Sequence, residues 1–472
     1  MIIVAGAVAS STAIQQNKNK TMTMISKSDK HNPNYLAKVI RIQNLRKLPK
    51  ADRLLVFNVD GNEIITSNET KEGTIGVYFP LECQIDAEYL SKTNSFTSKS
   101  LNLDPEKKGY FSDTGRVKAT RLRGQPSMGY VVPVSTFDYM LNEKELEELA
   151  SKVGEEFDTL KGVLLVKKYV VVRQQGLGGG DGKPKQGRSP KVSKLIDKQF
   201  RLHYDTSQLG KNMHRIQPED VISITWKLHG TSWVSSKILC KRPLTWLERL
   251  AKKLGVKVND TEYSNVYSSR KVIKNSDINK NPQHYYGTDI WGDINNIFKD
   301  QLKTGESLYG EAVGFTKDGG AIQKGFDYKC GPNEFKVYIY RVTQTGIDGN
   351  VIDLPFNMVQ ERAAQLGVEA VPYIYFGRAD RFLPYEDFEN VEQWQDALRE
   401  ILAIRYVKDQ DSQFCNNIVP EEGIVVRKEG HLAEAFKYKA FRFLEGETAS
   451  LDAGEVSVED EGSEDEESES ED

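Results

Sequence analysis

Residues 225–234 read TWKLHGTSWV, and this stretch decides which fold the second half of the chain can adopt. The segment is typical of a strand that runs into a turn at His229-Gly230. Lys227 stands two residues before that histidine, although a lysine is more often a solvated surface residue. Taken alone, Lys-x-His-Gly arises by chance in many proteins, and a structural lysine is the simpler interpretation. The rest of the sequence has to decide between a structural and a chemical role.

Length and composition predict two folded domains with tails. A chain of 472 residues is too long for one ordinary core, and 38% hydrophobic with 10% aromatic residues can build real cores. The net charge is −4, but residues 455–472 carry acidic side chains and no basic one, so the remainder is net basic. That combination is typical of a protein that handles a polyanion, with an acidic tail that could compete for the same surface.

Cysteine usage and apolar runs predict an intracellular protein, cytoplasmic or nuclear. The four cysteines are far apart in sequence and form no metal-binding knuckle or redox pair, which favours reduced thiols. The chain contains no run of 18 or more apolar residues, so no membrane span is expected. The opening MIIVAGAVASS has no basic residue before its apolar run, so we interpret it as a disordered start instead of a secretory signal.

Short apolar runs from Leu36 onward, such as LAKVIRIQNL and RLLVFNVDG, predict a small barrel of short strands. Cationic residues cluster on one strand-like stretch of this region: Arg116, Lys118, Arg121 and Arg123. They could track a phosphate backbone, or they could protect an edge strand by charge. The sequence leaves both interpretations open.

A helix and a linker are expected after the barrel. Residues 142–160 carry apolar residues at helical spacing, although Gly154 weakens the middle. Residues 173–191, RQQGLGGGDGKPKQGRSPK, fail the P-loop pattern because Lys183 precedes a proline, and they lack a correctly spaced third glycine for a dinucleotide fingerprint. We interpret them as a mobile basic linker or surface loop.

From about residue 215 the pattern changes to strands mixed with helices. Helices are expected around 355–366 and 391–406, and strands at 423–428 and 433–443. This is the layout of an α+β domain.

Five short motifs occur in order in this second half. They are Lys227 in KLHG, Ser269-Arg270 in VYSSRK, Tyr309-Gly310-Glu311 in LYGEAVGF, Glu422-Gly423 in EGIVVR, and Lys437-Tyr438-Lys439 in FKYKAF, with the aromatic strand VYIYRV between the third and fourth. The ordered set resembles the motifs of the covalent nucleotidyltransferase superfamily of ligases and capping enzymes. The wording KLHGTS, YGE, EGIVVR and KYK is most similar to the RNA ligase 2 family.

The first half carries a second resemblance. KLPKADRLLVFNVDG, residues 47–61, resembles the opening of the OB-fold in tRNA-binding domains and in phenylalanyl-tRNA synthetase. DNA ligases and capping enzymes carry an OB domain after the last lysine motif, whereas only FRFLEGETASLDAGE and the acidic tail follow Lys439 here. An OB domain that precedes the catalytic domain is similar to the Deinococcus and Naegleria type of RNA ligase.

The expected architecture is therefore α+β, with an N-terminal OB-fold β-barrel followed by an ATP-grasp-like nucleotidyltransferase (adenylylation) domain of antiparallel sheets with helices. The expected divisions are a disordered arm at 1–35, the OB-fold domain at 36–140, a helix and basic Gly-rich linker at 141–214, the nucleotidyltransferase domain at 215–446 and an acidic disordered tail at 447–472.

The resemblance implies an ATP-dependent RNA ligase that seals 3′-OH to 5′-phosphate RNA ends, with nicked duplexes as the expected substrate, through a lysyl-AMP intermediate on Lys227. An amine is nucleophilic only when neutral, so Lys227 must be desolvated or lie among cations. Lys437 and Lys439 share one face of a strand about 6.6 Å apart and would hold the α-phosphate. Their alternative is a strand with two solvated lysines.

Carboxylates suit Mg²⁺ or Mn²⁺, and the resemblance implies that Glu422 serves the metal while Glu311 contacts the ribose or the metal's waters. A lone glutamate at a strand end is otherwise a solvated cap. Tyr338 and Tyr340 share a face by the two-residue period, and one of them, preferably Tyr340, would stack on adenine. Ordinary core aromatics are a close alternative.

Arg270 resembles the family arginine that reaches the nucleotide or the end of the acceptor strand, and its fork suits phosphate. His229 could orient a water or a nucleic-acid end, or it could stabilise the turn. The other histidines form no ligand spacing.

Two alternatives stay open. A DNA ligase or capping-type guanylyltransferase would use the same motifs but is disfavoured by the domain order. A non-catalytic tRNA- or RNA-binding factor would use the OB domain alone, and retention of every charged motif residue argues against it. The expected partners are ATP and RNA with 3′-OH and 5′-phosphate ends, without a membrane, and the expected state is a monomer.

Overall fold

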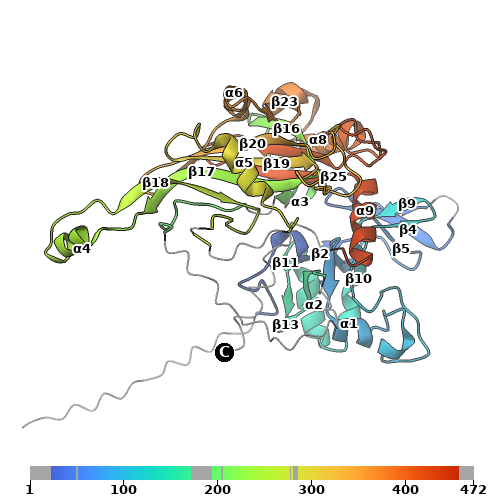
Figure 1. Cartoon of the computed structure of the whole chain (residues 1–472). Helices are drawn as coiled ribbons and strands as arrows, with labels where there is room; N and C mark the ends of the chain where they lie inside the picture. Colours follow the sequence, from blue (N-terminus) through green and yellow to red (C-terminus); the bar gives the residue numbers. More distant parts are fainter. Residues whose placement is uncertain are drawn as a thin grey trace, which may run out of the picture.

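The computed structural model describes residues 23–48, 51–171, 194–203, 206–276, 278–279 and 285–455. These residues form a smaller β-rich domain followed by a larger α+β domain (Figure 1). The expected basic linker at 173–191 lies outside the described residues, as do most of the expected arm and acidic tail. Over the ranges that the structure describes, no helix is both long and apolar enough to cross a membrane.

The first domain is a set of short, mostly antiparallel strands. Its central sheet has the order β10-β6-β2-β11, with β2 at Ala37–Arg41, β6 at Ile75–Phe79, β10 at Tyr130–Pro133 and β11 at Glu156–Phe157. A second sheet joins β3 (Arg46–Lys47), β4 (Leu54–Val59) and β5 (Asn62–Ser67). Smaller sheets pair β7 (Cys83–Ile85) with β14 (Val166–Lys168), β8 (Thr120–Leu122) with β9 (Gln125–Ser127), and β12 (Thr159–Leu160) with β1 (Ile25–Ser26) and β13 (Val163–Leu164).

The core of this domain lies between the central sheet and two helices, α1 (Ala87–Lys92) and α2 (Glu143–Ser151). Val39, Val77 and Phe79 are fully buried there, because alternate residues of β2 and β6 point to the same face. Asn142 caps α2 and forms a reciprocal capping box with Glu145.

Two expected boundaries differ in the first domain. The helix expected over 142–160 ends at Ser151, since Gly154 has a φ of +97° and the residues beyond it pair with other strands as β11 and β12. Ile25, inside the expected arm, pairs with Leu160 and is buried in the core. In both places long-range strand pairing outweighs local helical or polar character.

The second domain is built on two mostly antiparallel sheets, in which β15–β25 and β20–β22 are parallel pairs. One has the order β15-β25-β24-β16-β23, with β15 at Ser207–Gln208, β16 at Val221–Trp226, β23 at Tyr373–Arg378, β24 at Gly423–Lys428 and β25 at Glu434–Lys439. The other has the order β18-β17-β19-β20-β21, with β17 at Thr231–Lys241, β18 at Thr261–Ser268, β19 at Glu306–Gly314, β20 at Phe335–Thr345 and β21 at Val351–Asp353, and β22 (Glu369–Ala370) pairs with β20.

Helices cover these sheets: α3 (Leu209–Asn212), α5 (Ile290–Phe298), α6 (Phe356–Gln365), α7 (Ala379–Phe382), α8 (Val391–Tyr406) and α9 (Phe441–Asp452). The helices expected around 355–366 and 391–406 are confirmed as α6 and α8. The strand expected at 433–443 ends at Lys439, and α9 begins two residues later.

Helix α9 continues to Asp452, past residue 447, where the acidic tail was expected to begin. Phe441 and Phe443, in the first turn of α9, are buried and give this acidic helix an apolar face to pack. Figure 1 shows α9 standing between the two domains.

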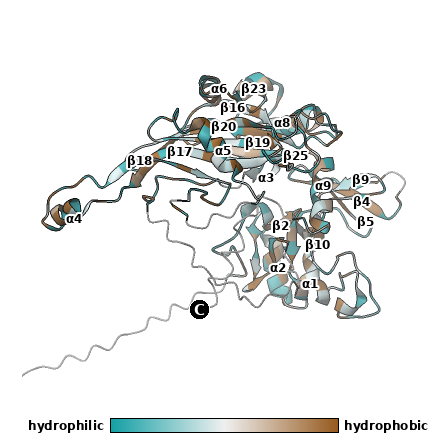
Figure 2. Cartoon of the chain, in the orientation of Figure 1, coloured by the Kyte–Doolittle hydropathy of each residue, from teal (hydrophilic) through white to brown (hydrophobic). Residues whose placement is uncertain are grey.

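The β17–β18 hairpin extends away from the body and carries α4 (Trp246–Lys253) at its tip (Figures 1 and 2). Trp246 and Leu254, at and just beyond the ends of α4, are largely exposed.

Candidate active site

Lys227 lies directly after β16, where the strand leaves the first of the two sheets. Its backbone N–H donates to the carbonyl of Gly423 at 2.9 Å, which ties the residue to the start of β24. The turn that follows needs a glycine, because a Cβ on Gly230 would lie 2.1 Å from the carbonyl oxygen of Ala312. The expected strand and turn therefore fix Lys227 between the two sheets.

A cavity of about 130 Å³ opens beside Lys227. Both sheets and the intervening segments contribute to its wall, and six of the residues selected from the sequence line it: Lys227, Arg270, Glu311, Tyr340, Lys437 and Lys439. Motifs that are far apart in the chain thus meet around one small volume.

Glu422 is buried beside the lysines and is 2% exposed. Its Oε1 lies 2.7 Å from Nζ of Lys227 and 3.3 Å from Nζ of Lys439. Burial opposes ionisation of Glu422, but the charges of the two lysines outweigh it and hold the pKa of this carboxyl below its ordinary value. Among the described residues, no hydrogen-bond partner reaches the other oxygen, Oε2.

This pairing corrects the expected environment of Lys227. The sequence argument placed its amine among cations or in a desolvated site, whereas the structure also gives it an ion pair with Glu422. A neighbouring carboxylate favours the ammonium form of lysine. The reason for the pair is that a buried, ionised Glu422 needs compensating positive charge.

Glu311 points from β19 to the turn after Lys227. Its two oxygens accept hydrogen bonds from the N–H of Gly230 at 3.0 Å and from the hydroxyl of Ser232 at 3.1 Å. The carboxylate therefore supports the turn in addition to lining the cavity, and it is more than a solvated cap.

Of the two tyrosines of β20, Tyr340 lines the cavity and Tyr338 does not. The pairing register skips Tyr340, since Gly310 pairs with Ile339 and Tyr309 pairs with Arg341. Tyr340 lines the cavity and its hydroxyl contacts Nε2 of His203, whereas Tyr338 is not among the lining residues. A β-bulge re-aims the side chain of the extra residue, which the simple two-residue period does not foresee.

His229 packs among aromatic side chains near the lysines. Its backbone N–H donates to the hydroxyl of Tyr328 at 2.6 Å, and its ring packs against the edges of Phe326 and Phe443. Burial lowers the pKa of His229, which favours the neutral imidazole. It is not among the residues that line the first cavity, so its surroundings favour the turn-stabilising interpretation.

A second cavity of about 470 Å³ lies between the two domains. Lys437 and Lys439 line both cavities, and His229 joins them here. The first domain contributes Lys168 and Tyr169 among others, and α9 contributes part of the remaining wall. The paired lysines of β25 are thus shared between a small inner cavity and a larger one at the domain junction.

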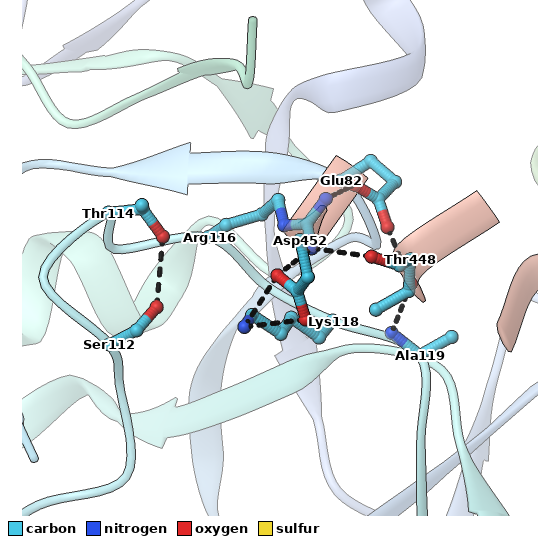
Figure 3. A network of polar contacts seen from close by, with 8 residues as sticks. All are labelled: Glu82, Ser112, Thr114, Arg116, Lys118, Ala119, Thr448 and Asp452. Carbon is cyan, nitrogen blue, oxygen red and sulfur yellow. Dashed lines mark hydrogen bonds and ion pairs between the residues drawn. The ribbon is translucent and has the colours of Figure 1, made fainter. Parts of the chain in front are cut away.

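The basic stretch of the first domain faces α9. Arg116 is 2% exposed and forms ion pairs with Glu82 and Asp452, and Lys118 also pairs with Asp452 (Figure 3). Arg121 pairs with Glu445 of α9. Neither the phosphate-tracking nor the edge-protecting interpretation describes these three residues, because carboxylates of the second domain already neutralise them.

Sequence reasoning missed several residues of the inner cavity. His203 lines it together with Arg341, Arg427 and Phe356. Arg341 forms two hydrogen bonds to the buried carboxylate of Asp353, at 2.6 and 3.1 Å. Arg341 and Arg427 stand in the quoted stretches VYIYRV and EGIVVR but were not selected, so their place in the motifs was the available signal. His203 and Phe356 stand in no quoted motif, and only the tertiary structure places them here.

The donor set fits a divalent cation that is shared with a phosphate ligand. Among the described residues, no group of three or more His, Cys, Asp or Glu side chains could hold a metal ion alone. Mg²⁺ is commonly bound through one or two carboxylates, with waters and phosphate oxygens completing its shell. The uncontacted Oε2 of Glu422 supplies such a carboxylate oxygen, and Glu311 lies in the wall of the cavity next to it.

A family model described as an OB-fold domain matches residues 36–134. Three solved structures of an RNA ligase from Naegleria gruberi align with most of the chain. An apo mutant is 17% identical with a TM-score of 0.53, covering 88% of this chain and 98% of its own. A mutant with AMP and Mn is 17% identical with a TM-score of 0.52, covering 87% and 98%. A mutant with ATP and Mn is 16% identical with a TM-score of 0.51, covering 88% and 98%.

No curated protein sequence matches the chain. At these identities the structural likeness defines the fold. The chain is an OB-fold domain followed by an α+β domain of antiparallel sheets and helices, in the arrangement of the Naegleria RNA ligase. The fold expected from the ordered motifs is confirmed.

Proposed function

We propose that this protein is an ATP-dependent RNA ligase. The observation that carries the proposal is the ion-paired cluster of Lys227, Glu422 and Lys439 beside a cavity lined by the residues of five sequence-ordered motifs. The similar structures support it, because their protein is named an RNA ligase and was solved with ATP or AMP and Mn.

In the first step, Nζ of Lys227 attacks the α-phosphate of ATP. A P–N bond forms, the bond to the β-phosphate oxygen breaks, and pyrophosphate leaves with the electron pair. Lys437 and Lys439 lie in the cavity wall, where they offset the negative charge that develops on the transferred group. A divalent cation at Glu422 supplies further positive charge to the phosphates when it is bound.

The ammonium proton of Lys227, whose side chain is 19% exposed, has to pass to water before the attack, because only the neutral amine is a nucleophile. The carboxylate of Glu422 lies 2.7 Å from this amine, and a neighbouring negative charge favours the charged form of a lysine. A cation bound to Glu422 would offset the negative charge of this carboxylate. The neutral, reactive amine of Lys227 would then be favoured.

Two further steps complete the proposed reaction. The 5′-phosphate of an RNA strand displaces Lys227 and takes the AMP. The 3′-OH of a second strand then attacks that phosphate, AMP leaves, and a phosphodiester forms. We propose a nicked duplex as the substrate, because both ends are then held close together.

Labelled ATP tests the first step directly. Incubation with α-labelled ATP and Mg²⁺ should give a covalent protein adenylate that is absent from Lys227→Ala. Labelled GTP in a parallel reaction distinguishes a capping-type guanylyltransferase. Equal labelling of Lys227→Ala and the unaltered protein would refute the proposal.

Nick sealing tests the substrate. The assay compares four duplexes with a single nick, which combine RNA or DNA on the 3′-OH side with RNA or DNA on the 5′-phosphate side. We expect sealing to require RNA on the 3′-OH side, whereas preference for DNA on both sides would favour a DNA ligase. RNA binding with steep salt dependence but no nucleotide labelling would favour the binding-factor alternative.

A further inference from the structure

Lys439 pairs with two carboxylates, one from Glu422 and one from Glu447. Its Nζ lies 3.3 Å from Oε1 of Glu422 and 2.6 Å from Oε1 of Glu447, and it lies 5.0 Å above the ring centroid of Phe443. The side chain of Lys439 is 11% exposed, so these partners enclose most of it. Lysine has a long flexible stem, and two anions with one aromatic face confine its ammonium far more than one anion would.

Glu447 belongs to α9, and the neighbouring residues of that helix are anchored in the first domain. The hydroxyl of Thr448 donates to Oε1 of Glu82 at 2.9 Å, and its carbonyl accepts from Arg116 at 3.0 Å (Figure 3). One turn further along, Asp452 pairs with Arg116 and with Lys118 at 2.8 Å.

Burial makes this anchor rigid. The side chains of Arg116 and Glu82, which both bond to Thr448 of α9, are 1% and 17% exposed, so these contacts lie largely out of water, whereas the side chain of Asp452 is 47% exposed. Breaking a buried ion pair leaves an uncompensated charge, which costs far more than breaking an exposed one. The first domain therefore fixes the position of α9 at the residue adjacent to Glu447.

We propose that Glu447 is a positioning residue for Lys439, and that the first domain controls the position of Lys439 through α9. This inference rests on the proposed function, since it assigns Lys439 to the transfer of the nucleotide. Glu447 does not touch the inner cavity; it acts through the ammonium of Lys439.

The substitution Glu447→Gln tests the positioning role. It keeps the size of the side chain but removes the charge that holds Lys439. We expect the single-turnover rate of adenylate formation at saturating ATP to fall about tenfold, while the ATP concentration for half-maximal rate changes less than about twofold. A merely structural role would lower the yield of folded protein and would not separate these two quantities.

Two companion variants sharpen the test. Glu447→Asp keeps a carboxylate and should recover most of the rate, to within about threefold of the unaltered protein. Arg442→Gln is the control on the same helix, because Arg442 pairs with Asp411 of its own domain, where both side chains are exposed, and not with Lys439 or the first domain. It should stay within about twofold, since exposed ion pairs contribute little.

Asp452→Asn tests the link to the first domain. It weakens the anchor of α9 without touching Lys439, and we expect a fall of about threefold at saturating ATP in the same direction as Glu447→Gln. An unaltered rate in Asp452→Asn would overturn the role of the first domain. An unaltered rate in Glu447→Gln would overturn the positioning role itself.

The two levels of proposal fail in different ways. If the unaltered protein forms an adenylate that Lys227→Ala lacks, the proposed function stands whatever Glu447→Gln does. If the unaltered protein forms no adenylate with any nucleotide, the proposed function fails first.

Discussion

Glu422 and Lys227 form an ion pair of 2.7 Å at the base of the inner cavity, and the carboxylate is more deeply buried than the amine. The pair joins the turn after β16 to the start of β24, so it fixes the relative position of two strands in addition to its charge. Glu422 and the two lysines that contact it favour one another's charged forms. Glu422 is therefore the residue on which the proposed chemistry depends most.

Removing the charge of Glu422 should therefore abolish most of the adenylate formation. We expect Glu422→Gln to lower the single-turnover rate by at least about a hundredfold, because both the proposed metal carboxylate and the ionic partner of two lysines are lost. Labelling with α-labelled ATP measures the rate. Glu421→Gln makes the same chemical change one residue away and should stay within about threefold; similar losses in both variants would contradict the assignment.

Glu421 should control the pH dependence of stability. Burial raises its pKa from 4.5 to about 7, so the folded chain binds more protons than the unfolded chain between these values. Stability from this group is present below the lower value and is lost as the pH rises through the upper one. Glu421→Gln should stabilise the protein by about 1 to 3 kcal/mol near pH 8.

That gain should shrink toward zero near pH 4.5, where Glu421 is protonated in the folded protein and increasingly so in the unfolded chain. Thermal unfolding midpoints of both proteins across this range measure the difference. A constant difference at every pH would show that the carboxyl group does not titrate as argued.

Gly230 should tolerate no side chain. A methyl group there meets the carbonyl of Ala312 at 2.1 Å, and the turn that holds Lys227 has to shift. We expect Gly230→Ala to destabilise the protein by about 1 to 3 kcal/mol and to slow labelling by ATP. The matched control is Gly446→Ala in α9, where nothing lies within 4 Å of the added group, and it should be neutral or stabilise by up to about 1 kcal/mol.

Tyr340 should contribute to nucleotide binding through its ring. Tyr340→Phe removes the hydroxyl that contacts His203 but keeps the aromatic face in the cavity wall. We expect it to raise the half-saturating ATP concentration less than about threefold, and Tyr340→Leu to raise it about tenfold. Tyr338→Leu is the control outside the cavity, and an equal effect there would reject the assignment.

Much of the fold followed from local patterns. The strand that ends at Trp226, the turn at His229-Gly230, and helices α6 and α8 all lie where periodicity and turn residues predicted them. These features depend on neighbours a few residues apart in the chain, and that information is present in any single sequence.

The helix expected over 142–160 ends early and α9 extends past the expected start of the tail at 447, and both differences have a common reason. Residues 156–160 pair with strands β1 and β2, which are distant in sequence. The acidic residues of α9 form ion pairs with Arg116 and Arg121 of the first domain. Pairing across such separations leaves no local trace.

By itself the sequence selected the residues that we propose carry the chemistry, since the order and wording of the motifs singled out three lysines and Glu311 of the cavity wall and the neighbouring Glu422. Only the tertiary structure decided how those residues meet. It gave Lys227 and Lys439 one shared carboxylate, turned Tyr340 and not Tyr338 into the cavity, and matched Arg116 with Asp452. The physical reason is that burial and charge compensation depend on distances between strands and helices, and these are fixed only when the whole chain has packed.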